Sequence, residues 1–210
     1  MTRPPKARAL LLDSALQVFR EKGFAATSVE MLCQRAGVTK GAFFHHFESK
    51  NALAVAACAH WSAVTGLLFE QAPYHRPEDP LDRVLAYIAF RRLLLRGTPS
   101  QFTCVAGTLA QEVHASHGEI RQAAADSILA HADTLVEDFA LAIERHPPVT
   151  PVDARSLAVH TQAVLQGAFV LAKATGSEAP AQDSVDHLYR YIAMLFGRDP
   201  TPPLPEPQHD

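Results

Sequence analysis

The residues best suited to chemistry lie in one short stretch, T-K-G-A-F-F-H-H at residues 39–46. A short helix beginning here is cationic at its start, and Phe43 is expected to face inward. The side chains left to face outward are small, basic or aromatic. Such a face suits entry into a DNA groove, where cations meet phosphates and helix side chains meet base edges. The outward set is Lys40, Gly41, Ala42, Phe44, His45 and His46.

Two further helices must position this one. Thr27 and Glu30 are spaced as a capping box, which predicts a helix over residues 29–36. Gly37 supplies the turn, and the next helix is predicted over residues 40–47, where Thr39 is placed to cap it. The three parts together predict a helix-turn-helix, in which the second helix reads DNA.

Other kinds of site are not indicated by the residues. His45 and His46 are not expected to bind metal, because adjacent helical residues point about 100° apart and no third ligand lies nearby. The sequence has no Gly-rich phosphate loop, H-E-x-x-H motif or nucleophile elbow, so we expect neither an enzyme nor a cofactor. Three widely spaced cysteines, Cys33, Cys58 and Cys104, favour free thiols in a reducing cytoplasm over disulfides or zinc.

The net charge of −3 conceals an asymmetry. Residues 1–50 carry eight Lys and Arg against four Asp and Glu, whereas residues 51–210 carry eleven against eighteen. A positive head on a negative body suits a head that meets a polyanion, although chance clustering is the alternative. No long apolar run without a charge is evident, so we expect no membrane span.

Helical periodicity dominates the whole chain and predicts an all-α fold of about nine helices. An N-terminal three-helix DNA-binding domain is expected over residues 1–48 and a larger helical bundle over residues 49–198. The Pro-rich tail, residues 199–210, is expected to be disordered. The predicted helices cover residues 6–22, 29–36, 40–47, 50–71, 81–96, 101–115, 120–145, 152–175 and 182–196.

The segment from Phe19 to Lys50 resembles the amino-terminal domain of the TetR family of bacterial repressors. The resemblance rests on F-x-x-x-G-F-x-x-T-S-V, on A-G-V-T-K-G and on F-x-H-F-x-S-K, with almost no gap. The helical remainder matches the family's effector-binding domain in length and helix count. The resemblance implies a dimeric repressor that binds a palindromic operator and is released by a small molecule.

The family's DNA contacts can be transferred position by position. Thr27, Ser28 and Lys50 correspond to phosphate contacts, and His45 corresponds to a base or phosphate contact. Phe44 departs from the family, which usually has a tyrosine there, so it lacks the hydroxyl that bonds a phosphate and can only pack. The DNA-binding residues implied are Thr27, Ser28, Thr39, Lys40, Gly41, Phe44, His45 and Lys50.

The effector site is expected among the middle helices, where apolar side chains predominate and a few polar ones are interspersed. This composition favours a hydrophobic or aromatic ligand. Most of these aromatic residues are expected simply to form core. The candidate pocket residues are Trp61, Tyr87, Phe90, Cys104, His131, Gln162, Gln166, Phe169 and Lys173.

Cys104 has two interpretations. The stretch T-C-V-A-G-T-L-A-Q-E resembles a TetR subgroup in which some members respond to electrophiles through this cysteine, with a lysine at the position of Lys173. A nearby cation would raise the thiolate fraction. Thr103 replaces the subgroup's glycine, and a buried, inert thiol is the interpretation that we favour.

Apolar residues at helical spacing over 157–171 and 188–196 predict either a homodimer seam or internal core. We expect a dimer because one short reading helix buries too little surface to find a site alone. Two alternatives remain: a nucleoid protein that binds DNA without sequence preference, and a helical small-molecule carrier with a vestigial helix-turn-helix.

Overall fold

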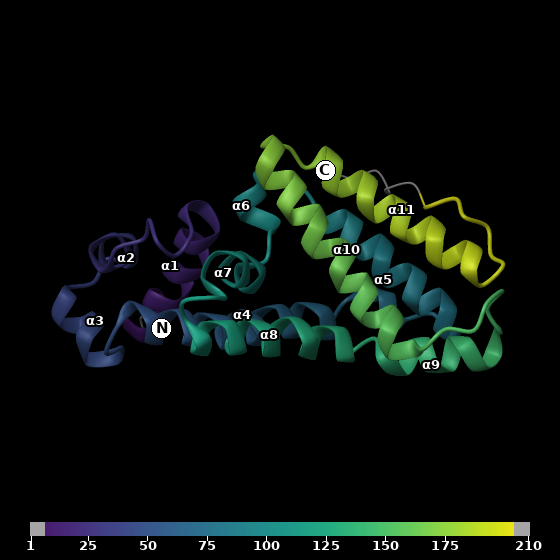
Figure 1. Ribbon diagram of the computed structural model, residues 1–210, viewed down its shortest axis with the longest axis horizontal. Coiled ribbons are helices and arrows are strands. Elements are labelled where there is room, and N and C mark those ends of the chain that lie inside the picture. The colour runs from purple at the N-terminus through teal and green to yellow at the C-terminus, as the bar shows by residue number, and fades with distance from the viewer. Residues whose placement is uncertain (1–6, 204–210) are drawn as a thin grey trace, which may run out of the picture. The chain divides into compact units, whose positions relative to one another are not determined.

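The computed structural model describes residues 7–203, and within that range every regular element is a helix (Figure 1). The all-α prediction is therefore confirmed. The packing divides the chain into two compact units. Among the described residues, unit 1 comprises 7–70 and 103–129, and unit 2 comprises 71–102 and 130–203.

Unit 1 begins with the predicted helix-turn-helix. Helix α1 spans Ala7–Lys22, α2 spans Val29–Ala36 and α3 spans Lys40–His46. Gly37 adopts the left-handed conformation, with φ 65°, and its amide bonds back to the end of α2. This backbone conformation favours glycine, which explains why the turn is at this position.

The remaining helices of unit 1 are α4 (Lys50–Glu70), α7 (Val105–Val113) and most of α8 (Gly118–Asp133). Phe19, Leu32 and Phe43 are fully buried and bring α1, α2 and α3 together, while Leu53 of α4 is equally buried. Burial of large apolar side chains stabilises such a core by roughly 1.5–3 kcal/mol each.

Helix α4 corrects one expectation, because residues 51–69 form a long apolar run without a charge. By length and composition alone, α4 could cross a membrane. Its first half is instead buried within unit 1 at Leu53, Ala54, Ala57 and Cys58, and α4 contacts both α1 and α7. The first half of the run therefore provides one side of the core of unit 1, whereas Val64, Leu67 and Leu68 in the second half are exposed.

Unit 2 contains the short helix η1 (Pro73–His75), α5 (Pro80–Leu94), α6 (Pro99–Phe102), α9 (Val136–Arg145), α10 (Ala154–Thr175) and α11 (Ala179–Leu195). Helix α5 packs against α9 and α11, and α10 packs against α9 and α11. Figure 1 shows α10 and α11 running side by side. Tyr87, Phe139, Leu165 and Ile192 form the buried centre.

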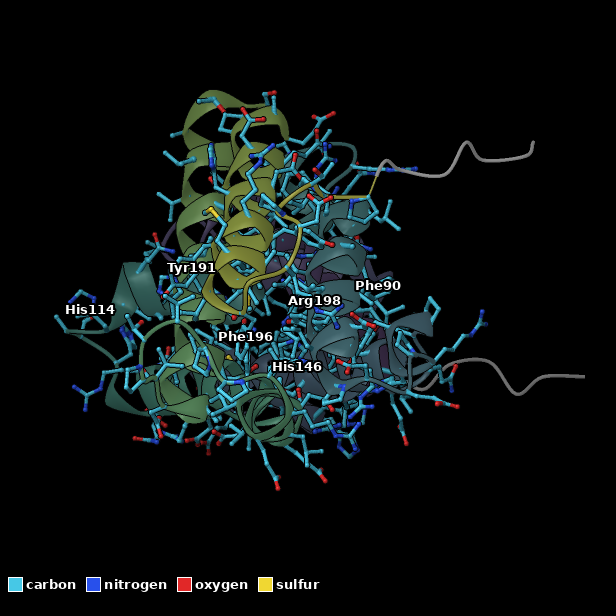
Figure 2. The ribbon with its side chains drawn as sticks, turned by 90° about the vertical axis from the view of Figure 1, so that its right-hand side faces the viewer. Phe90, His114, His146, Tyr191, Phe196 and Arg198 are labelled. Carbon is cyan, nitrogen blue, oxygen red and sulfur yellow. The ribbon has the colours of Figure 1, made fainter. Side chains whose placement is uncertain are left out.

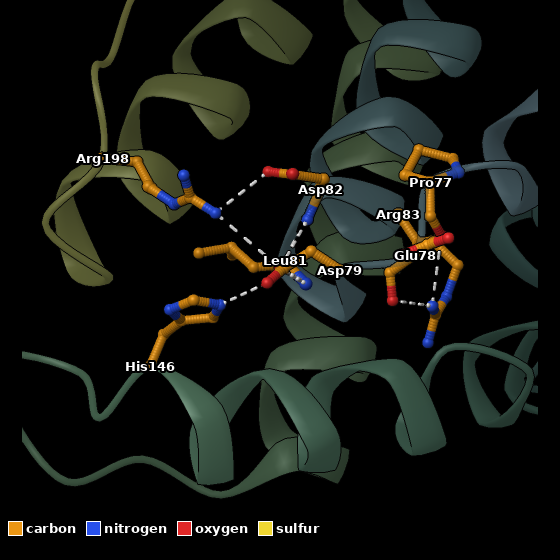
Figure 3. Close-up of polar contacts among 8 residues, drawn as sticks. All are labelled: Pro77, Glu78, Asp79, Leu81, Asp82, Arg83, His146 and Arg198. Carbon is orange, nitrogen blue, oxygen red and sulfur yellow. Dashed lines mark hydrogen bonds and ion pairs between the residues drawn. The ribbon is translucent and has the colours of Figure 1, made fainter.

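One corner of unit 2 is joined by polar side chains (Figure 3). Asp79 caps α5 by accepting from the amides of Leu81 and Asp82, and its other oxygen lies 2.6 Å from His146 Nε2. Arg198, after α11, bonds Asp82 at 3.1 Å. The corner thus links the start of α5 to the ends of α9 and α11.

Two predicted helices are each interrupted. The helix predicted over 101–115 is broken at Thr103 and Cys104, where Cys104 is extended and its sulfur accepts from Gly107 N at 3.4 Å. The helix predicted over 120–145 is broken after Asp133, where Leu135 is buried and its amide bonds three residues back to Ala132. Neither break contains Gly or Pro.

Smaller differences concern the helix ends. Ser28, and not Thr27, caps α2 by accepting from Met31 N at 3.2 Å. Of the predicted tail, residues 199–203 are not helical, and 204–210 lie outside the described residues, as does the predicted helix start at Lys6.

Candidate DNA-binding surface and effector site

Helix α3 presents the face that its sequence predicts. Thr39 caps it, accepting from Ala42 N at 3.1 Å. Phe43 is fully buried, whereas Phe44 is 56% exposed and packs edge-on against the Phe43 ring at 5.1 Å. Lys40, Gly41 and His45 are also exposed, and His46 is partly buried. The outer side of α3 therefore carries cationic, small and aromatic groups on an apolar base.

Lys40 forms an ion pair with Glu30 of α2. The hydrogen bond from Lys40 is the main reason that the pKa of the Glu30 carboxyl lies below its usual value. Both side chains are exposed, so the pair is readily exchanged for other partners. A phosphate group near Lys40 would compete directly with Glu30.

The two hydroxyl side chains at the start of α2 differ in their exposure. Ser28 is exposed, but Thr27 is only 1% exposed, and its hydroxyl donates to the Gly23 carbonyl at 2.5 Å. In this conformation the Thr27 side chain fixes the loop before α2. The exposed Ser28 and the helix-start amides are the groups that an anion can reach.

Lys50, at the start of α4, also bonds internally. Its ammonium donates to the carbonyls of Phe24 and Thr27, both at 2.7 Å, and lies 4.1 Å from the centre of the Phe24 ring. Desolvation lowers the pKa of Lys50, while the Glu112 carboxylate raises it. The lysine expected to contact phosphate thus also holds the α1–α2 loop.

Seven candidate pocket residues lie in unit 2, and three of them form one polar chain. The amide of Gln162 donates to the Tyr87 hydroxyl at 3.2 Å, which lies 2.9 Å from His131 Nε2. Desolvation, with help from the Arg91 charge, lowers the pKa of His131 to about 3. The imidazole is therefore neutral, and in the tautomer with its proton on Nδ1 its Nε2 accepts a hydrogen bond from the hydroxyl.

Aromatic rings and one cation surround this chain. Tyr74 of η1 packs edge-on against Tyr87 at 5.2 Å and also faces Phe90 at 6.0 Å. The Arg91 guanidinium lies 5.8 Å from the centre of the Phe169 ring. Sequence reasoning missed Tyr74, which follows a proline in a loop, and Arg91, which lies one helical turn after Tyr87 and could have been found from that spacing.

The other candidates divide between the units. In unit 2, Gln166 is partly buried and Lys173 is exposed. Trp61 and Cys104 belong to unit 1, where Arg20 links them: its guanidinium lies 5.1 Å from the centre of the Trp61 ring and interacts electrostatically with Cys104. Arg20 was missed because nothing in its sequence separation from Cys104 indicates the contact.

Cys104 is a free thiol, 9% exposed, at the start of α7. Its sulfur accepts a hydrogen bond from Gly107 N. Nearby Cys58 is more deeply buried, and burial raises its pKa to about 12. Of the two thiols, Cys104 is therefore the more accessible and the better placed beside a cation.

Helices α10 and α11 carry an outward stripe of small residues, apolar residues and two histidines. On α10 the exposed positions recur every three or four residues, and on α11 they do the same. His160 and Tyr191 join the two helices, with ring centres 5.4 Å apart (Tyr191 is labelled in Figure 2). We name this surface the α10–α11 stripe; its residues are His160, Ala163, Gly167, Val170, Leu171, His187, Tyr191 and Met194.

The residues expected at a dimer seam divide by burial. Leu157, Thr161, Leu165 and Ala168 are buried within the protomer and form internal core, as do Leu188 and Ile192. The residues of the α10–α11 stripe, in contrast, are exposed to solvent in the single chain.

A capped helix-turn-helix followed by a bundle of long helices is the architecture of a helical DNA-binding regulator. Residues 11–57 match the family described as bacterial regulatory proteins, tetR family, and residues 80–188 match the tetracyclin repressor-like C-terminal domain. The chain belongs to the TetR family.

Individual relatives agree with this assignment. The Mycobacterium tuberculosis HTH-type transcriptional repressor Rv3405c is 38% identical over 92 residues, covering 43% of this chain and 48% of its own length. The Tn10 TetC protein of Escherichia coli is 48% identical over 48 residues, covering 23% of this chain and 24% of its own. The matched segments thus span no more than about half of these curated relatives.

Solved structures match over most of the chain. Escherichia coli NemR in its reduced form has a TM-score of 0.71 at 25% identity, covering 88% of this chain and 95% of that one. A TetR-family regulator from Agrobacterium tumefaciens has a TM-score of 0.76 at 20% identity, covering 92% and 100%. The second likeness concerns the fold alone.

Proposed function

We propose that the chain is a cytoplasmic, ligand-responsive transcriptional repressor that binds a palindromic operator as a homodimer. The observation that carries this proposal is the outer face of α3, where Lys40, Gly41 and His45 stand exposed above buried Phe43. A rigid apolar base under a cationic, hydrogen-bonding face is what a groove-reading helix needs. This role requires neither a cofactor nor a catalytic group.

The proposed division of labour on DNA follows the exposure of each side chain. Lys40, Ser28 and the amides at the start of α2 meet phosphates, and Thr39 and Gly41 let the start of α3 approach the duplex closely. His45 meets a base edge, and Phe44 packs against sugar or a thymine methyl. Thr27 and Lys50 support this surface through the α1–α2 loop, and Lys50 also adds a positive charge beside it.

For the effector, we propose a hydrophobic or aromatic small molecule that binds in unit 2. The Gln162–Tyr87–His131 chain would supply hydrogen bonds among aromatic rings, with Arg91 as an adjacent cation. An electrophile that modifies Cys104 is the second candidate, favoured by the Arg20 cation beside that thiol.

Dimerisation is assigned to the α10–α11 stripe. Small residues at Ala163 and Gly167 would let a second copy approach closely, and the flanking apolar side chains would be buried by it. Two heads held by such a dimer would reach successive major grooves about 34–36 Å apart.

The first test is a gel shift with DNA from upstream of the chain's own gene, repeated with hydrophobic aromatic compounds and with an electrophile. A specific shift that a compound reverses supports the proposal. Release by the electrophile that is lost in Cys104→Ser would assign sensing to the thiol. Equal binding to unrelated DNA would instead indicate a nucleoid protein, and absence of binding a helical carrier.

A further inference from the structure

Phe24, in the loop between α1 and α2, is held by three other parts of unit 1. Its side chain is 5% exposed. Its ring lies 5.9 Å from that of Phe19 on α1 and 5.1 Å from that of His117, which precedes α8. The Lys50 ammonium of α4 lies 4.1 Å from the same ring. The loop is therefore anchored through one aromatic side chain.

The backbone of this loop is held by two opposite charges. Both carboxylate oxygens of Glu112, near the end of α7, accept hydrogen bonds: one from Phe24 N at 2.5 Å and one from Ala25 N at 2.8 Å. The Lys50 ammonium donates hydrogen bonds to the carbonyls of Phe24 and Thr27. Charge-assisted bonds of this kind are among the strongest in proteins. Amides and carbonyls of the loop are thus fixed by separate helices.

We propose that Glu112 is a positioning residue for DNA recognition, which rests on the DNA-binding function proposed above. The loop that it holds leads directly into Ser28, the cap of α2, and α2 packs against α3. Fixing the amides of Phe24 and Ala25 fixes where α2 begins and hence how α3 is presented. Glu112 does this from α7, outside the helix-turn-helix.

The sign of the effect separates this role from simple electrostatics. Glu112 is a negative charge close to the DNA-binding helices, so its removal would by charge alone strengthen attraction to DNA. A positioning role gives the opposite sign, because the loop amides lose their acceptor and α2 is held less firmly. Weaker binding after loss of the charge therefore favours positioning.

The experiment uses the full chain and a duplex selected from a random library by the wild-type protein. We expect Glu112→Gln to weaken binding to that duplex roughly tenfold, with an unchanged slope of affinity against salt. Glu112→Asp retains the charge but is too short to reach both amides, so it should weaken binding as well. Glu119→Gln, an exposed carboxylate on α8, is the matched control and should bind as tightly as wild type or more tightly.

Two further measurements exclude a merely structural effect. The dissociation constant is determined for the active fraction, found by titration with excess DNA, so partial unfolding does not imitate weaker binding. Hydrogen exchange without DNA should be faster at the amides of Phe24 and Ala25 in Glu112→Gln than in Glu119→Gln.

Several outcomes would overturn the proposal: unchanged or tighter binding by Glu112→Gln, wild-type affinity of Glu112→Asp, or unchanged exchange at both amides. Failure of the wild-type chain to select any duplex would refute the proposed function. The exchange measurement needs no DNA, so the loop contact would still be judged independently.

Discussion

The Tyr87 hydroxyl lies 2.9 Å from Nε2 of His131 and accepts a hydrogen bond from the Gln162 amide at 3.2 Å. A hydroxyl that accepts from an amide has its own proton free to donate. In the neutral imidazole with its proton on Nδ1, Nε2 accepts a hydrogen bond from this hydroxyl. The low pKa of His131, about 3, agrees with this neutral form.

The first prediction concerns acid stability. Because the folded-state pKa of His131 is about 3 and the ordinary value is 6.5, the unfolded chain binds more protons between those limits. The contribution of neutral His131 is complete above pH 6.5 and falls progressively as pH drops toward 3. Thermal unfolding scans should show a decline in this window that is shallower in His131→Gln, which keeps a hydrogen-bonding side chain without titrating.

The control for this prediction is His114→Gln, an exposed histidine at the end of α7 and outside the α10–α11 stripe. That variant should retain the wild-type pH dependence. An equally steep decline in His131→Gln would mean that other groups, such as the carboxylate of Asp79 with its lowered pKa, dominate the acid response.

The second prediction concerns Lys50. In Lys50→Met the carbonyls of Phe24 and Thr27 lose a charged donor, so we expect the free energy of unfolding to fall by roughly 2 kcal/mol. DNA affinity should fall for all sequences alike. Lys22→Met removes an exposed cation of α1 and should leave stability nearly unchanged. Chemical denaturation measures the difference, and equal midpoints would refute the structural role of Lys50.

The DNA-binding head was predictable because its signals are local. Gly37 requires a left-handed backbone, Thr39 caps the next helix, and Phe43 falls on the buried side at helical spacing. The break at Thr103 and Cys104 was not predictable in this way, since it contains neither Gly nor Pro. It depends on a sulfur that accepts from Gly107 N, a weak cap that sequence patterns do not reveal.

Contacts across long sequence separations were predicted least well. Glu112 and Phe24 are 88 residues apart in the sequence. Their hydrogen bond joins a side chain to a backbone amide, so no pairing of residue types indicates it. The interaction of Arg20 with Cys104 likewise has no signal in the sequence. Tyr87, His131 and Gln162 could be nominated by residue type, but only packing brings them into one chain.

The third prediction concerns the ion pair between Lys40 and Glu30. Lys40→Ala should weaken binding to all DNA sequences and reduce the salt slope by about one, as expected for loss of a phosphate contact. Glu30→Gln frees the same lysine from its competing carboxylate and should tighten binding at low salt. His45→Ala should instead change which sequences are preferred.

These three variants are compared by binding to a selected duplex and to single-base substitutions of it, over a range of salt concentrations. A change of sequence preference in Lys40→Ala without a change of slope would assign Lys40 to a base and not to a phosphate. If His45→Ala instead weakens binding to all duplexes equally, His45 does not recognise a base.

The last prediction concerns the α10–α11 stripe. Leu171 is 48% exposed and Met194 is 56% exposed in the single chain, on helices joined by the contact between His160 and Tyr191. A glutamate at either position would be buried without a partner if a second copy covers the stripe, and burial of an unpaired charge is costly. The double variant Leu171→Glu, Met194→Glu should therefore raise the dimer dissociation constant by roughly a hundredfold or more. Val149→Glu, at a position 76% exposed and outside the stripe, should leave it unchanged. Sedimentation equilibrium measures both, and a double variant that remains dimeric would place the interface on another surface.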